Sequence, residues 1–319
     1  MVVIWVPLVA LSSKGAVQVE GTATYEAFSV SSGSRGVFVE EQFSATVEGG
    51  RWFVATSLKS TQPPMQRPEL FCPPAQTAGS DGEDSSYWKE MRTNRAPVAW
   101  VEPGSVPNMA QSPTICLIWL AYCSGHYFET SGKQQLKPIW VVQQNQNRQG
   151  KCMMPVTFER SKENPDFLSQ LDFLADGRLD SCNPSHGREN MRAEPWQAGF
   201  TQAVYRVERM ATLPEGKRIP AVFIFELFSP GPPGPAPPKL GLFARIKGTV
   251  TNTLTVAKMA SWLPQLPNGQ RVMVQDYRFT GQVTNWDNFA YAVTNQWAGR
   301  SNVAVVQAVR LHATTAPPR

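Results

Sequence analysis

One apolar stretch, SPTICLIWLAYCSG, which begins at Ser112 and ends at Gly125, constrains the fold more than any other part of the chain. Ser112 is a favoured helix N-cap, Pro113 fits the first helical turn, and Gly125 suits a left-handed helix stop. Residues 115–123 contain no polar side chain except the tip of Tyr122. Because such a helix has no polar face, we expect it to be buried on all sides.

The rest of the chain alternates between apolar and polar residues with a period of two, as half-buried strands do. The cleanest case is residues 37–47, where apolar side chains share one face and Glu41 alone interrupts them. The 27 prolines and 10 tryptophans also favour strands and turns over helices. We therefore predict a mainly β fold, in which a large curved antiparallel sheet or half-barrel wraps around one buried helix.

Several further segments have strand patterns bounded by turn residues. They are residues 16–30, 52–58, 87–88, 154–160, 167–174, 200–210, 219–228, 240–257, 271–280 and 288–293. Residues 136–144 are apolar but fit neither a strand nor a helix pattern clearly. The proline-rich tract at 229–238 predicts an exposed loop at a sheet end, because proline lacks the N–H that a sheet interior needs.

The N-terminal residues MVVIWVPLVALSS resemble the hydrophobic region of a secretory signal, although a basic segment before it is missing. We interpret residues 1–15 as a truncated signal segment, with a first strand as the alternative. Residues 16–300 then form a single β-rich domain, and residues 301–319 form a tail. This interpretation predicts export to the periplasm or the extracellular space.

The charge pattern argues against nucleic-acid binding, and the cysteines show no dense disulfide framework. The net charge of +5 is spread along the chain without a run of Lys or Arg, so we expect no nucleic-acid binding. Of the five cysteines, Cys116 and Cys123 lie in the apolar stretch, where small buried thiols are expected. Cys72 and Cys182 lie in polar segments and are the better candidates for a disulfide, but the sequence does not fix the pairing.

No catalytic or metal-binding signature is present. The sequence has no G-x-S-x-G elbow, no P-loop and no G-x-G-x-x-G motif. Cys123 and His126, with Cys182 and His186, have the ligand types of a zinc site, but Cys123 lies inside the apolar stretch. We therefore predict a protein that is not an enzyme and that needs no metal or cofactor.

Aromatic side chains are numerous on the predicted strands and helix. Core packing explains most of them, but a curved sheet over one helix often cannot fill its concave side. Such a space would be apolar and would bind a lipid or another apolar small molecule. The residues predicted to line it are Phe43, Trp52, Trp119, Tyr122, Phe225 and Tyr277.

The order FSATVEGG, RWFVATSL, a proline-rich crossing and SDGEDSSYW resembles the N-terminal half of the periplasmic lipoprotein carrier proteins and their lipoprotein-like relatives. That resemblance implies an open, curved half-barrel that holds acyl chains against its concave face. The chain departs from it in its long middle insertion, the cysteines of its helix and its proline-rich tract. Segments along the whole chain, among them SPTICLIWLAYCSGHYF and GFTQAVYRVERM, also resemble uncharacterised secreted proteins of verrucomicrobial-type bacteria.

Three functions remain open from the sequence. The first is an exported, non-enzymatic protein that binds an apolar ligand or a lipid-bearing partner such as a lipoprotein. The second is a structural or interaction module that contacts an envelope protein or the membrane surface. The third is a hydrolase with an unrecognised site near His126 or His186. An apolar cavity would favour the binding protein. A filled core with an exposed apolar edge would favour the interaction module, and a polar cleft would favour the hydrolase. The sequence does not determine the oligomeric state.

Overall fold

The computed structural model describes the greater part of the chain. The described residues are 15–29, 31–62, 73–90, 98–103, 112–128, 135–143, 148–174, 202–230, 240–264, 273–276 and 305–307.

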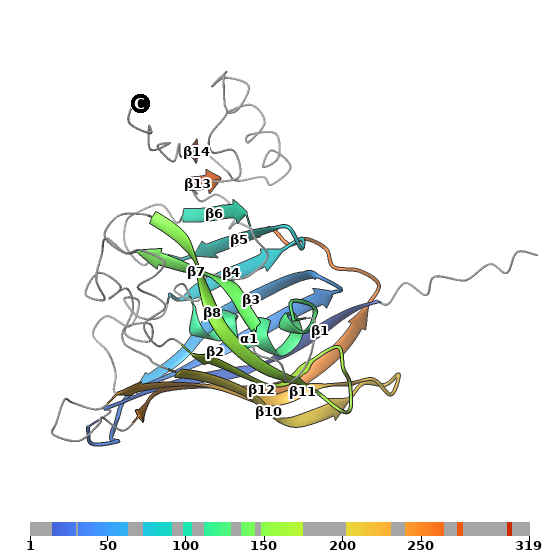
Figure 1. Cartoon of the computed structure of the whole chain (residues 1–319). Coiled ribbons are helices and arrows are strands. Elements are labelled where there is room, and N and C mark those ends of the chain that lie inside the picture. Colours follow the sequence, from blue (N-terminus) through green and yellow to red (C-terminus); the bar gives the residue numbers. More distant parts are fainter. Residues whose placement is uncertain are drawn as a thin grey trace, which may run out of the picture.

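Within these residues, fourteen strands join into one sheet (Figure 1). The strands are β1 (Ala16–Phe28), β2 (Arg35–Glu48), β3 (Arg51–Gln62), β4 (Ala75–Ser80), β5 (Asp84–Lys89), β6 (Val98–Pro103), β7 (Gln135–Gln143), β8 (Arg148–Arg160), β9 (Leu168–Leu174), β10 (Gln202–Thr212), β11 (Arg218–Pro230), β12 (Leu240–Val256), β13 (Met273–Asp276) and β14 (Val305–Gln307). Their order across the sheet is β14-β13-β6-β5-β4-β3-β2-β1-β12-β11-β10-β9-β8-β7.

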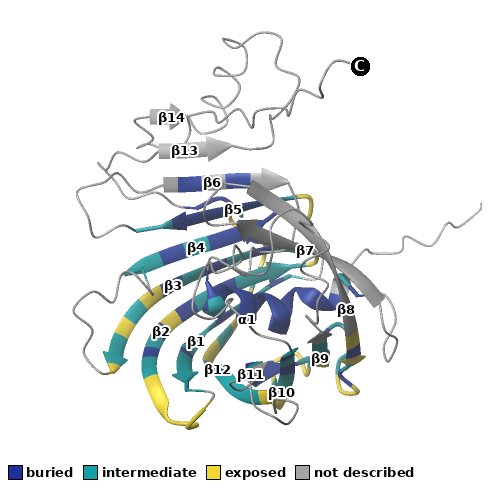
Figure 2. Cartoon of the chain, turned by 60° about the vertical axis from the view of Figure 1, so that its left-hand side comes forward, coloured by how far each residue is buried: buried dark blue, intermediate teal, exposed yellow. Residues whose placement is uncertain are grey.

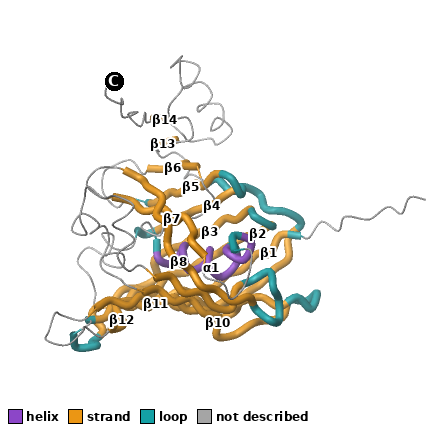
Figure 3. Tube along the Cα trace, viewed as in Figure 1, coloured by secondary structure: helices purple, strands orange, loops and turns teal. Residues whose placement is uncertain are grey.

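The sheet curves around one α-helix, α1 (Pro113–Tyr122), which lies against strands β1, β2, β3, β10, β11 and β12 (Figure 3). We call the face that carries α1 the concave face. Figure 2 shows α1 dark blue, and every helical residue from Thr114 to Tyr122 is buried. The predicted fold class is therefore confirmed: a mainly β protein in which a curved sheet wraps one buried helix.

The start of α1 follows the sequence prediction, but its end does not. The Ser112 side chain accepts a hydrogen bond from the Ile115 N–H, and Pro113 occupies the first turn. The helix ends at Tyr122, and Gly125 lies in a short 3-10 helix, η2 (Ser124–His126), instead of acting as a left-handed stop. Gly125 is needed there for space, because a Cβ would come within 2.0 Å of the Asp166 carbonyl oxygen.

Strand β2 shows how the alternating sequence positions the core. Val39, Glu41, Phe43 and Ala45 are buried on the concave face, and the residues between them point to the opposite face. The neighbouring strand β1 has a register irregularity between Glu20 and Gly21. A side chain at Gly21 would meet the Phe43 ring and the carbonyl of β12, so glycine lets the strands approach.

One end of the sheet departs from antiparallel pairing, and the sequence prediction of the strands was incomplete. Strand β13 pairs in parallel with both β6 and β14, whereas the other described pairs are antiparallel. Strands β4 and β6 were not predicted, and residues 136–144 fall almost entirely in strand β7. The predicted strand at 288–293 and most of the loop at 229–238 lie outside the described residues.

Candidate functional site

The concave face carries an apolar cluster built from side chains of both the sheet and α1; we call it the concave cluster. Five residues predicted to line a ligand site belong to it, and each is at most 6% exposed: Phe43, Trp52, Trp119, Tyr122 and Phe225. The sixth, Tyr277, lies outside the described residues. The structure thus brings the five described residues into one interior, while their contact with a ligand stays a prediction.

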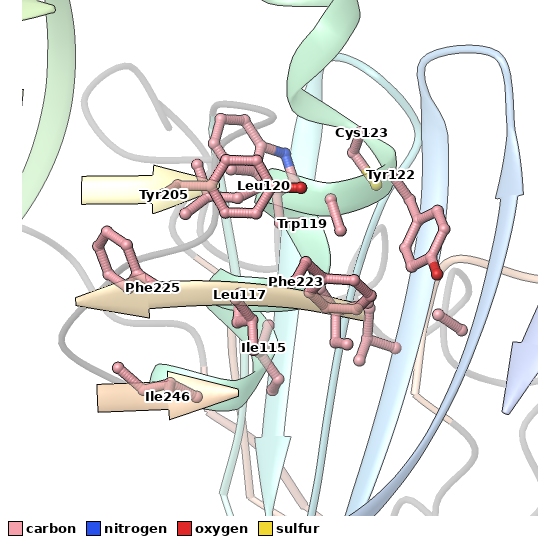
Figure 4. Close-up of a cluster of buried hydrophobic side chains, with 14 of the residues drawn as sticks. Ile115, Leu117, Trp119, Leu120, Tyr122, Cys123, Tyr205, Phe223, Phe225 and Ile246 are labelled. Atoms are coloured by element: carbon pink, nitrogen blue, oxygen red, sulfur yellow. The ribbon is translucent and has the colours of Figure 1, made fainter. Parts of the chain in front are cut away.

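Aromatic rings hold α1 within this cluster (Figure 4). The Tyr122 ring meets the Phe223 ring edge-on at 5.6 Å between centroids and the Phe167 ring at 6.1 Å. Its hydroxyl donates a hydrogen bond to the Pro220 carbonyl at 2.6 Å. Trp119 meets Tyr127 edge-on at 5.8 Å. Side chains from β11, from the residue before β9 and from the segment after η2 therefore pack against α1.

One carboxyl group interrupts the apolar surface of the concave cluster. Glu41 is 3% exposed and sits where the alternation of β2 placed it. Its Oε1 accepts hydrogen bonds from Thr56 Oγ1 on β3 at 3.3 Å and from Gln76 Nε2 on β4 at 3.2 Å. Its Oε2 is hydrogen-bonded to the hydroxyl of Thr114 in the first turn of α1. Glu41 thus links three elements of the fold: two neighbouring strands and the start of the helix.

A further bond extends this network, because the Tyr87 hydroxyl donates to Gln76 Oε1 at 2.8 Å. Burial raises the pKa of Glu41, and the hydrogen bonds from Thr114, Gln76 and Thr56 oppose that shift without cancelling it. The carboxyl therefore stays protonated to a higher pH than an exposed glutamic acid does. The interruption at Glu41 was visible in the sequence, but its partners on β4 and α1 were not.

A second polar group in the concave cluster lacks the partners that Glu41 has. Tyr205 on β10 is 0% exposed, and its side chain extends toward α1 in Figure 4. Its hydroxyl has no hydrogen-bond partner in the described part of the chain. Burial holds the pKa of Tyr205 far above its ordinary value, so the phenol is neutral and keeps its proton for donation. Sequence reasoning did not single out Tyr205, because its pattern is that of any core aromatic.

The two helix cysteines behave as predicted. Cys116 and Cys123 are buried thiols outside any disulfide, and burial raises the pKa of each. Thiols of this kind are protonated and unreactive at neutral pH. Cys72, Cys182 and His186 lie outside the described residues. No group of three His, Cys, Asp or Glu side chains within the described residues is arranged to hold a metal ion.

The opposite face of the sheet carries a charged cluster on strands β10, β11 and β12. There Glu226 on β11 is bound by Arg206 Nη1 and, at 2.8 Å, by Arg245 Nε. Burial works to raise the pKa of Glu226, but the hydrogen bonds and charges of the two arginines lower it overall. Glu226 is therefore a paired carboxylate, in contrast to Glu41, whose hydrogen-bond partners are uncharged.

A hollow of 670 Å³ also lies on this opposite face, across strands β12, β1, β2, β3 and β4. Side chains that point away from the concave cluster line it, among them Glu20, Thr22, Gln42, Ser44 and Ser57. Its lining is thus rich in hydroxyl and amide groups. This hollow differs in both place and chemistry from the apolar space that the sequence predicted beside the helix.

Comparison with known proteins gives a weak structural resemblance and no sequence match. No family model and no curated protein sequence matches the chain. A Vibrio parahaemolyticus domain assigned to the outer membrane lipoprotein-sorting proteins aligns with a TM-score of 0.34 and 6% identity, over 76% of this chain and 86% of that one. Lipovitellin, in a structure concerned with lipid–protein interactions, aligns with a TM-score of 0.30 and 8% identity, over 89% of this chain and 31% of its own. In the described part, no helix is long and apolar enough to cross a membrane.

Proposed function

We propose that this protein binds an apolar molecule with one hydrogen-bonding end group, such as a fatty acid or the acyl chain of a lipid, in the concave cluster beside α1. It is a binding protein and not an enzyme in this proposal. The observation that carries it is the unpaired hydroxyl of Tyr205, which lies fully buried among apolar side chains. A ligand with an apolar body and a single acceptor matches both features.

The energetics of the hydroxyl support this choice of ligand. Leaving a buried hydroxyl without a partner costs about 1–3 kcal/mol, and a partner that arrives with a ligand removes that cost. A carboxyl or ester oxygen is such a partner, because the phenol of Tyr205 can donate to it. The surrounding side chains of Phe225, Phe223 and Leu171 are fully buried and supply apolar contacts for a hydrocarbon chain.

Binding in this cluster requires α1 to move. All helical residues from Thr114 to Tyr122 are buried, and the rings of Phe223 and Phe167 pack on Tyr122. An acyl chain would therefore replace part of the contact between α1 and the strands. Ligand binding and the position of the helix are coupled in this proposal, since both draw on the same apolar surface.

A displacement titration tests the proposal. A fluorescent fatty acid is bound to the purified, delipidated protein and is then displaced with an unlabelled fatty acid. We expect saturable binding and full displacement, with the same affinity for the control variant Leu254→Ala, since Leu254 is 47% exposed and lies outside the concave cluster. A folded, monomeric protein that shows no saturable binding would overturn the binding role and favour an interaction module of the cell envelope.

Substitution of Tyr205 by Phe tests the end-group contact. We expect the affinity for the fluorescent fatty acid to fall about 2- to 13-fold, because one hydrogen bond of roughly 0.5–1.5 kcal/mol is lost. Without ligand, the variant keeps its stability or gains about 1 kcal/mol, since the unsatisfied hydroxyl is gone. Equilibrium denaturation and the same titration measure both effects. Equal fatty-acid affinities of the variant and the parent protein would remove Tyr205 from the site.

We also propose that the protein acts outside the cytoplasm, in the periplasm or beyond, where a carrier of lipids or lipoproteins would work. The support is the apolar segment MVVIWVPLVAL at the start of the chain, which has the character of a secretory signal. Fractionation of cells that express the gene with its upstream region tests this. Recovery of an unprocessed chain in the cytosol would contradict it.

A further inference from the structure

We propose that Glu41, Thr56, Gln76 and Thr114 form a proton-dependent latch that fixes the start of α1 to the concave face and releases it when Glu41 ionises. We call these four residues the Glu41 latch. The inference concerns the docking of the helix, and only its consequence for ligand binding rests on the proposed function.

The position of the latch makes it a control point for the helix. Thr114 is the residue after Pro113, in the first turn of α1, and its hydroxyl is bonded to Glu41 Oε2. Glu41 Oε1 is held in turn by β3 and β4 through Thr56 and Gln76. Other contacts of α1 described above are apolar or lie near its end, such as the bond from Tyr122 to Pro220. The latch is thus a polar attachment of the helix start.

The network suits a neutral carboxyl group. A protonated glutamic acid carries one donor, and a threonine hydroxyl can accept as well as donate, so either group can supply the proton between Oε2 and Thr114. The Oε1 atom then acts as the acceptor for Thr56 and Gln76. Every polar atom of the carboxyl therefore has a partner without any charge being buried.

Among the described residues, the groups that contact the Glu41 carboxyl are uncharged. Ala23 and Leu58 are its neighbours across the strands on β1 and β3, and Thr56, Gln76 and Thr114 are neutral. Behind Gln76, strand β5 contributes the phenol of Tyr87, and Lys89 is the basic residue opposite Gln76 on that strand. The first turn of α1 contains no acidic residue, and its last turn no basic one.

The direction of the pH effect follows from the raised pKa of Glu41. The protonated latch stabilises the fold fully at a pH below 4.5, the ordinary pKa of a glutamic acid. This stabilisation is lost as the pH rises through the higher pKa that Glu41 has in the folded protein. Above that pH an ionised carboxylate is buried among hydrogen-bond partners that carry no charge, which is costly. Moving the start of α1 away lets water reach the carboxylate, so ionisation favours release of the helix.

Hydrogen exchange of the peptide that covers residues 112–122 tests the latch without any ligand. After correction for the intrinsic rate, we expect its protection to fall between about pH 5 and about pH 8, by roughly tenfold for each unit by which the pKa exceeds the ordinary value. Peptides from β1 and β2 serve as an internal reference and keep their protection. Protection of the helix that stays constant relative to these peptides would overturn the proposal.

Two substitutions sharpen this test. Glu41→Gln keeps the shape and both kinds of hydrogen bond but cannot ionise, so its helix stays protected at both pH values. Thr114→Val removes the hydrogen bond between Glu41 and the helix, so α1 of this variant has low protection from exchange at both pH values. The matched control is Glu226→Gln, which changes a buried carboxyl on the opposite face and leaves the pH response of α1 as it was. A pH response that persists in Glu41→Gln would contradict the latch.

The consequence for ligand binding is measured separately with N-phenyl-1-naphthylamine, a neutral apolar dye whose own charge does not change over this range. We expect the parent protein to bind the dye more tightly at about pH 8 than at about pH 5, and Glu41→Gln to bind it equally at both. If the exchange of α1 responds to pH while the dye does not bind at either, the latch stands and the proposed function fails. If the dye binds while the exchange of α1 is constant, the latch fails alone.

Discussion

Replacing Trp119 with alanine lowers the free energy of unfolding by about 3–5 kcal/mol, as expected for a large aromatic side chain removed from a core. Trp119 is 6% exposed on α1 and packs edge-on against Tyr127. The substitution removes the apolar contacts of the indole and leaves a cavity that the rigid sheet cannot fill. Equilibrium unfolding in urea, followed by circular dichroism, measures the change.

The control for this experiment is Leu254→Ala on β12. Leu254 is 47% exposed, so its substitution changes the stability by no more than about 0.5 kcal/mol. A loss below about 1 kcal/mol in Trp119→Ala would mean that the side chain is not part of a packed core. The helix would then be a peripheral element and not the centre of the fold.

Phe223→Ala tests the sheet side of the same interface, and we expect a loss of about 3–5 kcal/mol. Phe223 is fully buried on β11, and its ring contacts Tyr122 edge-on at 5.6 Å. The ring also fills the space above Gly248 on β12, where a Cβ would come within 2.3 Å of the Phe223 ring. Thermal and urea unfolding of the variant measure the loss.

A double-mutant cycle with Gly248→Ala gives this prediction its control. In the parent protein, Gly248→Ala destabilises by about 1–3 kcal/mol, because the new methyl group collides with the ring. In the Phe223→Ala background the collision is gone, so the same substitution becomes neutral or stabilising. The expected coupling is about 1–3 kcal/mol. Strictly additive effects would show that the ring does not lie over Gly248.

The sequence predicted the parts of this fold that depend on local patterns. The apolar stretch from Ser112 to Tyr122 had no polar face, and a helix of that kind can only be buried. Alternation along β2 and β3 identified which side chains face the helix, including the interruption at Glu41. Such patterns can be recognised in a sequence because burial of one face of a strand requires every second residue to be apolar.

The remaining features depend on contacts between residues far apart in the chain. Gly125 looked like a helix stop, but its role is set by the backbone of Asp166, which no local pattern reveals. The partners of Glu41 lie on β3, β4 and α1, and the parallel pairing of β13 joins segments from three parts of the chain. Strand β4, with the sequence AQTAGS, has weak strand propensity and is formed by its neighbours.

The candidate site likewise contains residues that the sequence predicted and residues that only the structure identified. The sequence gathered Phe43, Trp52, Trp119, Tyr122 and Phe225 as aromatic residues of one interior, and the structure places them in the concave cluster. It gave no signal for Tyr205, because an unpaired hydroxyl becomes visible only when the surrounding side chains are known. The Glu41 latch likewise needed the fold, since Thr114 reads as an ordinary residue of the first helical turn.

Native mass spectrometry of the protein purified from its own cells, before and after extraction with organic solvent, tests the binding role most directly. We expect a non-covalent adduct with the mass of a fatty acid or lipid, which extraction removes and which added fatty acid restores. A fatty acid is then added to the extracted parent protein and to the extracted Tyr205→Phe variant. We expect a smaller fraction of the variant to carry the adduct. A folded protein that carries no adduct before extraction and accepts none afterwards would contradict the binding role.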